Sequence, residues 1–132
     1  MSQDEDNHDV SLSELQLELM HALWSRGEAS VADIAAALAD SRNLAHTTVA
    51  TVLTRLARRG MVEARRDGRQ LLYRAAVAEP EVRRSMVGDL LRTVFAGDPK
   101  ALLAHLVSER EVSTRDLERV RALLARKPVK PR

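Results

Sequence analysis

The sequence has no cysteine, which excludes disulfides and thiolate-bound metal sites. It has one Trp, one Tyr and one Phe in 132 residues, so its core must consist mainly of Leu, Val and Ala. With only five Gly and four Pro, and abundant Ala, Leu, Arg and Glu, the composition predicts a mainly helical protein. No run of about 18 apolar residues occurs, and the first residues are acidic, unlike a secretory signal peptide. We therefore expect a cytoplasmic protein that does not insert into membranes.

Motifs for catalysis are also missing. The chain has no Gly-rich phosphate loop, no Cys nucleophile and no Ser-His-Asp arrangement supported by its spacing. The histidines are scattered over separate segments without ligand spacing; they are His8, His21, His46 and His105. We predict that the protein is not an enzyme and uses no metal or cofactor.

Charge is strongly segregated along the chain. Residues 1–40 carry nine carboxylates and one arginine, a net charge of −8, whereas residues 41–75 carry eight arginines and two carboxylates, a net charge of +6. A basic block on a folded motif is typical of proteins that bind a polyanion.

The segment from Ala45 to Arg59 predicts an amphipathic helix that carries much of this positive charge. Its apolar residues recur on one side, while threonines and arginines occupy the other side, which has no carboxylate. Such a face can lie against phosphates and base edges without charge repulsion. We expect Thr47, Ala50 and Thr51 to lie nearest the base edges. Phosphate contacts are expected from Thr48, Arg55 and Arg58, and His46 can touch DNA at the start of the helix.

The surrounding segments complete a winged helix-turn-helix. Ser13 and Ser30 begin two capping boxes, although Ser11 with Glu14 offers an alternative to the first, and the two helices should end near Arg26 and Ala39. Asp67-Gly68-Arg69 between two extended segments predicts a β-hairpin with a basic tip. Three helices followed by such a hairpin form a winged helix, in which Arg66 and Arg69 can reach the flanking DNA backbone. Trp24 is expected to be a core residue of the first helix.

The second half predicts three further amphipathic helices, beginning near Glu79, Pro99 and Ser113. Some 50 residues of this kind have too little core to stand alone. We therefore predict a homodimer with interleaved apolar stripes; the alternative is that these helices fold back on the winged helix of a monomer. The predicted dimerisation residues are Val82, Met86, Leu90, Val94, Leu102, Leu106, Leu117, Val120 and Leu124.

These segments define the expected domain organisation. Residues 1–10 form a disordered acidic start, residues 11–77 a winged-helix DNA-binding domain, residues 78–126 a helical dimerisation domain, and residues 127–132 a disordered basic tail.

The motif from Leu44 to Gly60, with Leu19 to Trp24 and Phe95 to Pro99, resembles the penicillinase-repressor (BlaI/MecI/CopY) family over roughly residues 12–125. The resemblance implies a dimeric bacterial repressor that binds double-stranded DNA. It also implies release through a membrane sensor-protease pathway, with a cut that would fall near His105 and Leu106. The Asn-Phe pair of that cleavage site is absent here, as are the Cys-x-Cys motifs of copper-responsive relatives.

We therefore predict a homodimeric repressor that binds a palindromic operator until an inducing signal releases it. Two alternatives remain. The winged helix can be a protein–protein interaction module whose basic block meets an acidic partner, or the chain can be a regulator that responds to a small molecule.

Overall fold

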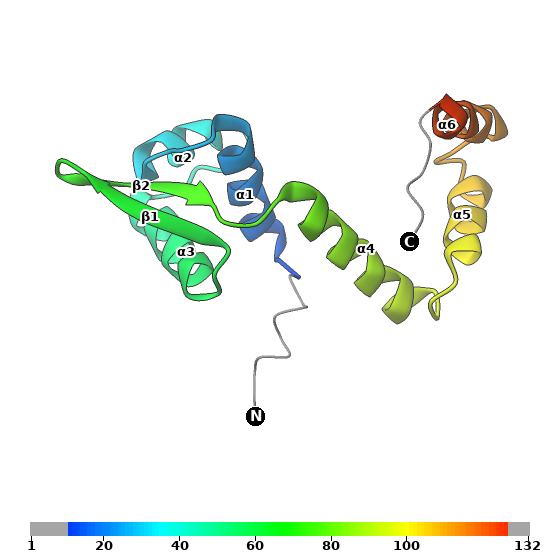
Figure 1. Cartoon of the computed structure of the whole chain (residues 1–132), viewed down its shortest axis with the longest axis horizontal. Helices are drawn as coiled ribbons and strands as arrows, with labels where there is room; N and C mark the ends of the chain where they lie inside the picture. The colour runs from blue at the N-terminus through cyan, green and yellow to red at the C-terminus, as the bar shows by residue number, and fades with distance from the viewer. Residues whose placement is uncertain (1–10, 127–132) are drawn as a thin grey trace. The chain divides into compact units, whose positions relative to one another are not determined.

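The computed structural model describes residues 11–126, so the predicted disordered ends and His8 lie outside the described residues. The described chain is mainly helical and has one antiparallel hairpin (Figure 1). It divides into two compact units, the first ending at Val87 and the second beginning at Gly88. The elements are α1 (Glu14–Arg26), α2 (Val31–Ala37), α3 (His46–Arg58), β1 (Val62–Asp67), β2 (Gln70–Ala75), α4 (Glu79–Val94), α5 (Pro99–Ser108) and α6 (Thr114–Arg126).

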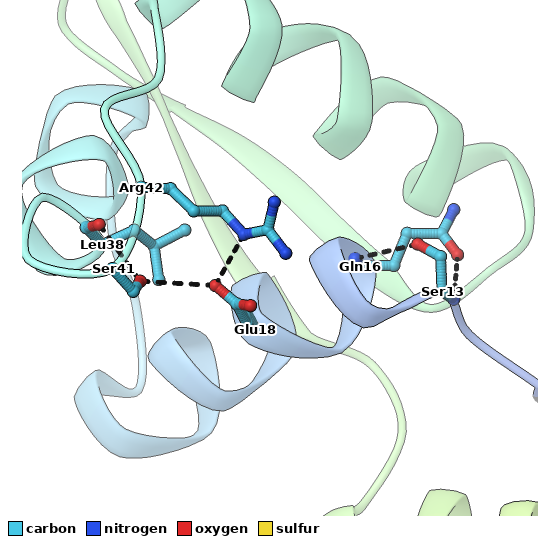
Figure 2. Close-up of polar contacts among 6 residues, drawn as sticks. All are labelled: Ser13, Gln16, Glu18, Leu38, Ser41 and Arg42. Atoms are coloured by element: carbon cyan, nitrogen blue, oxygen red, sulfur yellow. Dashed lines mark hydrogen bonds and ion pairs between the residues drawn. The ribbon is translucent and has the colours of Figure 1, made fainter.

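The first two helices begin at the predicted serines. The amide of Gln16 donates to Ser13 Oγ at 3.1 Å, and the amide of Ser13 donates to Gln16 Oε1 at 3.0 Å (Figure 2). This capping box supplies partners for N–H groups that the helix itself leaves unsatisfied, so α1 adopts the Ser13 register and not the Ser11 alternative. Ser30 and Asp33 form the same box at α2, which ends at Ala37, earlier than the predicted Ala39.

The hairpin has a shorter loop than predicted. Asp67 pairs with Gln70, which leaves only Gly68 and Arg69 in the turn. Gly68 has a φ of 65° and Arg69 has no positive φ, the pattern of a type II′ turn, in which the first central residue is glycine. At its base the hairpin is held by two hydrogen bonds between the backbones of Ala29 and Tyr73.

The core of the first unit is aliphatic, as the composition predicts. Leu53 and Leu56 of α3 are fully buried, and the half-buried Trp24 packs against the same cluster and donates from Nε1 to the carbonyl of Val77 at 2.9 Å. The buried hydrophobic residues are Leu12, Leu19, Met20, Leu23, Ala29, Ile34, Leu38, Val49, Leu53, Leu56, Met61, Val62, Tyr73 and Val82.

The beginning of α4 belongs to this core, which corrects part of the predicted dimerisation stripe. Val82 is 1% exposed within the core cluster, and Met86 is half-buried against it. The first unit therefore extends to Val87, past the predicted boundary after Val77. Because the Val82 side chain is already covered within its own chain, it cannot contribute to an interface with a second copy.

The second unit contains the end of α4, α5 and α6. Asp98 caps α5 by accepting from the amide of Lys100, and Ser113 and Asp116 form a capping box at α6. The rings of Phe95 and His105 lie 5.8 Å apart and link the segment after α4 to α5. From Gly88 to Arg126 no described residue is buried, in contrast to the first unit.

Candidate nucleic-acid interface

The exposed side of α3 is polar, basic and free of carboxylates. At about 100° per residue, Thr47, Thr51 and Arg58 fall together on this side, opposite the buried Val49, Leu53 and Leu56. Thr48 and Arg55 lie on one flank of this face, and His46 and Ala50 lie on the other flank, toward the hairpin. The helix therefore presents small side chains along its middle and cations toward its end.

Two threonine hydroxyls on this face donate hydrogen bonds to backbone carbonyls of the same helix. Thr51 Oγ1 donates to the carbonyl of Thr47 at 2.9 Å, and Thr54 Oγ1 donates to the carbonyl of Ala50 at the same distance. Since each proton is used within the helix, the oxygen of each hydroxyl can only accept a further hydrogen bond. In the major groove the matching donors are the amino groups of adenine and cytosine, and each threonine methyl can meet a thymine methyl.

Four of the predicted DNA-binding residues come together in one groove. His46 and Ala50 from α3 and Arg66 and Arg69 from the hairpin line a groove of about 450 Å³. The remaining lining residues are Ser30, Val31, Ala32, Gln70, Leu71 and Tyr73, so no carboxylate of the described residues 11–126 borders the groove. Thr47, Thr48, Thr51, Arg55 and Arg58 lie on α3 outside it.

Some arginines of the basic block, residues 41–75, form hydrogen bonds or ion pairs within the chain, and the others do not. Arg42 Nε donates to Glu18 Oε1 at 3.0 Å, which joins the turn before α3 to α1 (Figure 2). Arg65 makes two hydrogen bonds to the Glu28 carboxylate, at 2.7 and 2.9 Å. Arg74 pairs with Glu63, and Arg59 donates to the carbonyl of Ser11.

The remaining arginines of the block are those predicted to contact DNA. Among residues 11–126, no residue forms a hydrogen bond or ion pair with the side chain of Arg55, Arg58, Arg66 or Arg69. A cation without a carboxylate partner keeps its full charge for a phosphate, so these four positions can form the electrostatic part of a nucleic-acid interface.

The paired carboxylates remain ionised over a wide pH range. Hydrogen bonds from Arg42 lower the pKa of Glu18, and those from Arg65 lower the pKa of Glu28. Both glutamates therefore hold their arginines at neutral pH, and neither Arg42 nor Arg65 adds a free charge to the groove.

The two faces of the hairpin differ in whether their arginines are paired with carboxylates. Alternation along β1 places Arg65 on the face with Glu28, Leu72 and Arg74, while Arg66 lies on the groove face. One face thus carries ion pairs within the chain, and the other carries cations open to a ligand.

Comparison with known proteins agrees with this geometry. A family model described as penicillinase repressor matches residues 12–126. The chain belongs to the penicillinase repressor family. This family consists of DNA-binding transcriptional repressors, so the predicted resemblance and the predicted winged-helix fold are both confirmed.

Individual relatives of this repressor cover most of its length. The methicillin resistance regulatory protein MecI of Mammaliicoccus sciuri is 24% identical over 122 residues, 92% of this chain and 99% of that protein. The transcriptional regulator BlaI of Mycobacterium tuberculosis (strain CDC 1551 / Oshkosh) is 39% identical over 98 residues, 73% of this chain and 71% of that protein. The solution structure of the DNA-binding domain of the repressor BlaI covers 54% of this chain and 87% of that chain, with 22% identity and a TM-score of 0.49.

Several groove residues of this repressor were not among the predicted DNA-binding residues. They are Ser30, Val31, Ala32, Gln70, Leu71 and Tyr73. Leu71 pairs directly with Arg66 across the hairpin, so counting the strand alternation back from Arg66 could have placed it on the groove face.

The described part of the repressor shows neither a membrane-spanning helix nor a cluster of metal ligands. No helix within residues 11–126 combines the length and the apolar character that crossing a bilayer requires. In the same range, no three His, Asp or Glu side chains gather in a way that could hold a metal ion.

Proposed function

We propose that this repressor is a homodimer that binds a palindromic operator through α3 and the hairpin. The observation that carries the proposal is the sorting of the arginines. Those near the carboxylate-free face of α3 and the groove lack side-chain partners among residues 11–126, whereas Arg42, Arg65 and Arg74 are neutralised by glutamates. A repressor of this kind would act in the cytoplasm, associated with the nucleoid.

Each residue of the interface has a proposed role. Thr47, Ala50 and Thr51 approach base edges in the major groove, with Thr51 accepting a hydrogen bond through its oxygen. Thr48, Arg55 and Arg58 hold phosphates along α3, while Arg66 and Arg69 hold phosphates from the hairpin. His46, at the start of α3, lies where it can meet the same strand as the hairpin arginines.

The second unit supports dimerisation. Large apolar side chains remain exposed along the end of α4, α5 and α6, which isolated soluble chains seldom leave uncovered; they are Leu90, Val94, Leu103, Val120, Leu123 and Leu124. The predicted Leu102, Leu106 and Leu117 are half-buried. A second copy that covers these stripes would bring two winged helices to half-sites about one helical turn apart.

Release from DNA would follow an inducing signal. If a sensor-protease pathway cuts this chain near His105 and Leu106, the target bond lies inside α5. A helical bond is a poor protease substrate, so cleavage would require local opening of α5 first. The half-buried Leu106 and the ring contact between His105 and Phe95 are the contacts that such opening would break.

A salt titration of DNA binding tests the proposed function. Wild-type protein would be compared with Thr51→Ala, Arg58→Ala and the control Arg74→Ala on DNA from upstream of its own gene. With about six to ten phosphates neutralised, affinity should fall about 10³- to 10⁵-fold between about 50 and 200 mM salt. Arg58→Ala should weaken all duplexes alike and lower the salt slope by about one per bound domain.

The other variants separate specificity from charge. Thr51→Ala should relax sequence preference without changing the salt slope, and Arg74→Ala, whose arginine is paired with Glu63, should bind like wild type. Weak, salt-insensitive binding of wild type to every duplex would contradict the repressor proposal. An acidic protein partner would then become the better explanation of the basic face.

A second candidate function rests on a second groove in the first unit. Leu17, Trp24, Val82 and Met86 line an open groove of about 230 Å³ between α1 and the start of α4, with His21, Glu79 and Arg83 among the other lining residues. Such a site favours a regulator that responds to a small, largely apolar molecule. Because Trp24 is the only tryptophan, its fluorescence reports occupancy directly. A screened compound that shifts this fluorescence and lowers DNA affinity would support this function, and an unresponsive Trp24 would argue against it.

A further inference from the structure

Leu71 is an unexpected side chain on the candidate DNA surface. It is 37% exposed, and between residues 11 and 86 it is the one large hydrophobic side chain that is exposed. It lines the groove with Ala50, His46, Arg66 and Arg69. A ligand that carries both negative charge and apolar surface would match a groove that combines cations with this exposed part of Leu71.

The hairpin explains why Leu71 is exposed. Val62, Arg66, Leu71 and Tyr73 lie on one face of the two paired strands. At the base of the hairpin this face packs into the core, where Val62 and Tyr73 are 3% and 6% exposed. Toward the tip it carries the pair Arg66 and Leu71 out into the groove, so this apolar surface continues from the core to the region of the unpaired cations.

The chemistry of the groove matches one strand of DNA. Its cationic residues Arg66 and Arg69 have no carboxylate among their neighbours in the groove, while Leu71, Ala50 and the edge of Tyr73 supply apolar surface between them. A DNA strand alternates in the same way, with charged phosphates separated by deoxyribose rings that carry an apolar carbon at the 2′ position. An acidic peptide would match the cations but would leave Leu71 against polar backbone groups.

We propose that this groove holds one sugar–phosphate strand and that Leu71 packs against a deoxyribose between phosphates held by Arg66 and Arg69. This inference rests on the proposed function and adds to it a contact that reads the sugar. A ribose at the same position would bring its 2′-hydroxyl against the Leu71 methyl groups, where the hydroxyl loses hydrogen bonds to water. Leu71 therefore helps the repressor to distinguish DNA from RNA at this sugar.

The test uses full-length protein and a duplex selected by wild type from a random-sequence pool. Leu71→Ala should reduce affinity roughly three- to tenfold because it removes buried apolar contact, and it should leave the salt slope unchanged. Arg66→Ala should instead lower the slope by about one per bound domain. Leu72→Ala removes the same atoms from the opposite face of β2 and should bind like wild type, as should Leu71→Met. Thermal melting confirms that each variant is folded at the assay temperature.

Single ribonucleotide substitutions then locate the sugar. At one position in each half-site, a ribose should weaken wild-type binding roughly fivefold or more, and Leu71→Ala should lose most of that sensitivity. If Leu71→Ala binds the duplex with wild-type affinity, or if a ribose weakens both proteins equally, the inference is overturned and the proposed function still stands.

A matched set of deoxyuridine substitutions tests the thymine methyl group, the other apolar group on DNA that Leu71 can contact. If Leu71→Ala changes the response to loss of a thymine methyl and leaves the response to ribose unchanged, the deoxyribose contact is wrong. If wild type selects no duplex and its binding does not depend on salt, the proposed function and this inference fail together.

Discussion

The two units of this repressor have similar helices and very different interiors. Every buried side chain among residues 11–126 lies between Leu12 and Val82, in the first unit. In the second unit the same types of residue, Leu and Val, remain half-buried or exposed. The first unit therefore has a core of its own, whereas the apolar surface of the second unit suits contact with another chain.

Local signals do not explain this difference. A Ser–Asp capping box begins α2 in the first unit and α6 in the second, with nearly identical hydrogen bonds from Ser30 to Asp33 and from Ser113 to Asp116. Both helices thus start for the same reason. What separates the units is the hairpin and the beginning of α4, where Val82 is buried, which cover the apolar faces of the first unit only.

The largest expected effect comes from removing a core side chain of the first unit. Leu53→Ala, at a fully buried position of α3, should destabilise that unit by about 2–5 kcal/mol, because it removes apolar contacts and leaves a cavity. Leu124→Ala, at a position 55% exposed, is the matched control and should change the stability of monomeric protein by less than about 0.5 kcal/mol. Chemical denaturation at low protein concentration measures both. Similar losses for the two variants would mean that the second unit has a core of its own.

The next effect tests the exposed stripe of α4. Val94 is 61% exposed, and Val94→Lys would place a charge in the proposed dimer interface. The dimer dissociation constant should rise about 100-fold, with no change in the unfolding of the first unit. Sedimentation velocity over a concentration series measures this change. Thr93→Lys adds the same cation to the neighbouring position, and an equal loss of dimer with this control would show that charge alone, and not the Val94 contact, is responsible.

The smallest expected effect is the change with pH in how much each of the two capping boxes stabilises its helix. Hydrogen bonds from the backbones of Ser30 and Ser113 lower the pKa of Asp33 and Asp116 below the ordinary value of 3.8. Each ionised carboxylate therefore stabilises its helix above about pH 3.8, and this contribution disappears as the pH falls through the lowered pKa. Asp33→Ala should lower the melting temperature of the first unit at about pH 7, and Asp116→Ala that of the second unit.

Both differences from wild type should shrink as the pH falls below about 3.8 and should vanish only below the lowered pKa of each carboxylate. A variant that stays less stable than wild type by the same margin throughout an acid titration would show that the carboxylate charge is not what the cap contributes.

Much of the fold could be predicted because its signals are short. The serine caps, the proline at the start of α5 and the period of α3 each depend on residues within one or two turns. The hairpin was also predicted, but its loop was assigned one residue too many, because the sequence did not show that Asp67 pairs with Gln70 and belongs to the strand.

The site could be predicted less completely. The spacing along α3 identified its exposed residues, yet it could not indicate that the Thr51 hydroxyl is satisfied by the Thr47 carbonyl. Strand alternation from Arg66 could have placed Leu71 on the groove face, but its exposed fraction depends on packing that the sequence does not state.

By itself, the sequence determined the family, the order of the elements and the basic character of α3 and the hairpin. Only the tertiary structure decided which arginines stay available to bind DNA phosphates. Arg42 and Arg65 find Glu18 and Glu28, which lie 24 and 37 positions away, while Arg58 and Arg66 find no described carboxylate. It also placed Val82 in the first core, away from the proposed dimer surface. Helix caps and periodicity act between neighbours in sequence, whereas ion pairs and burial depend on distances that exist only after the elements have packed.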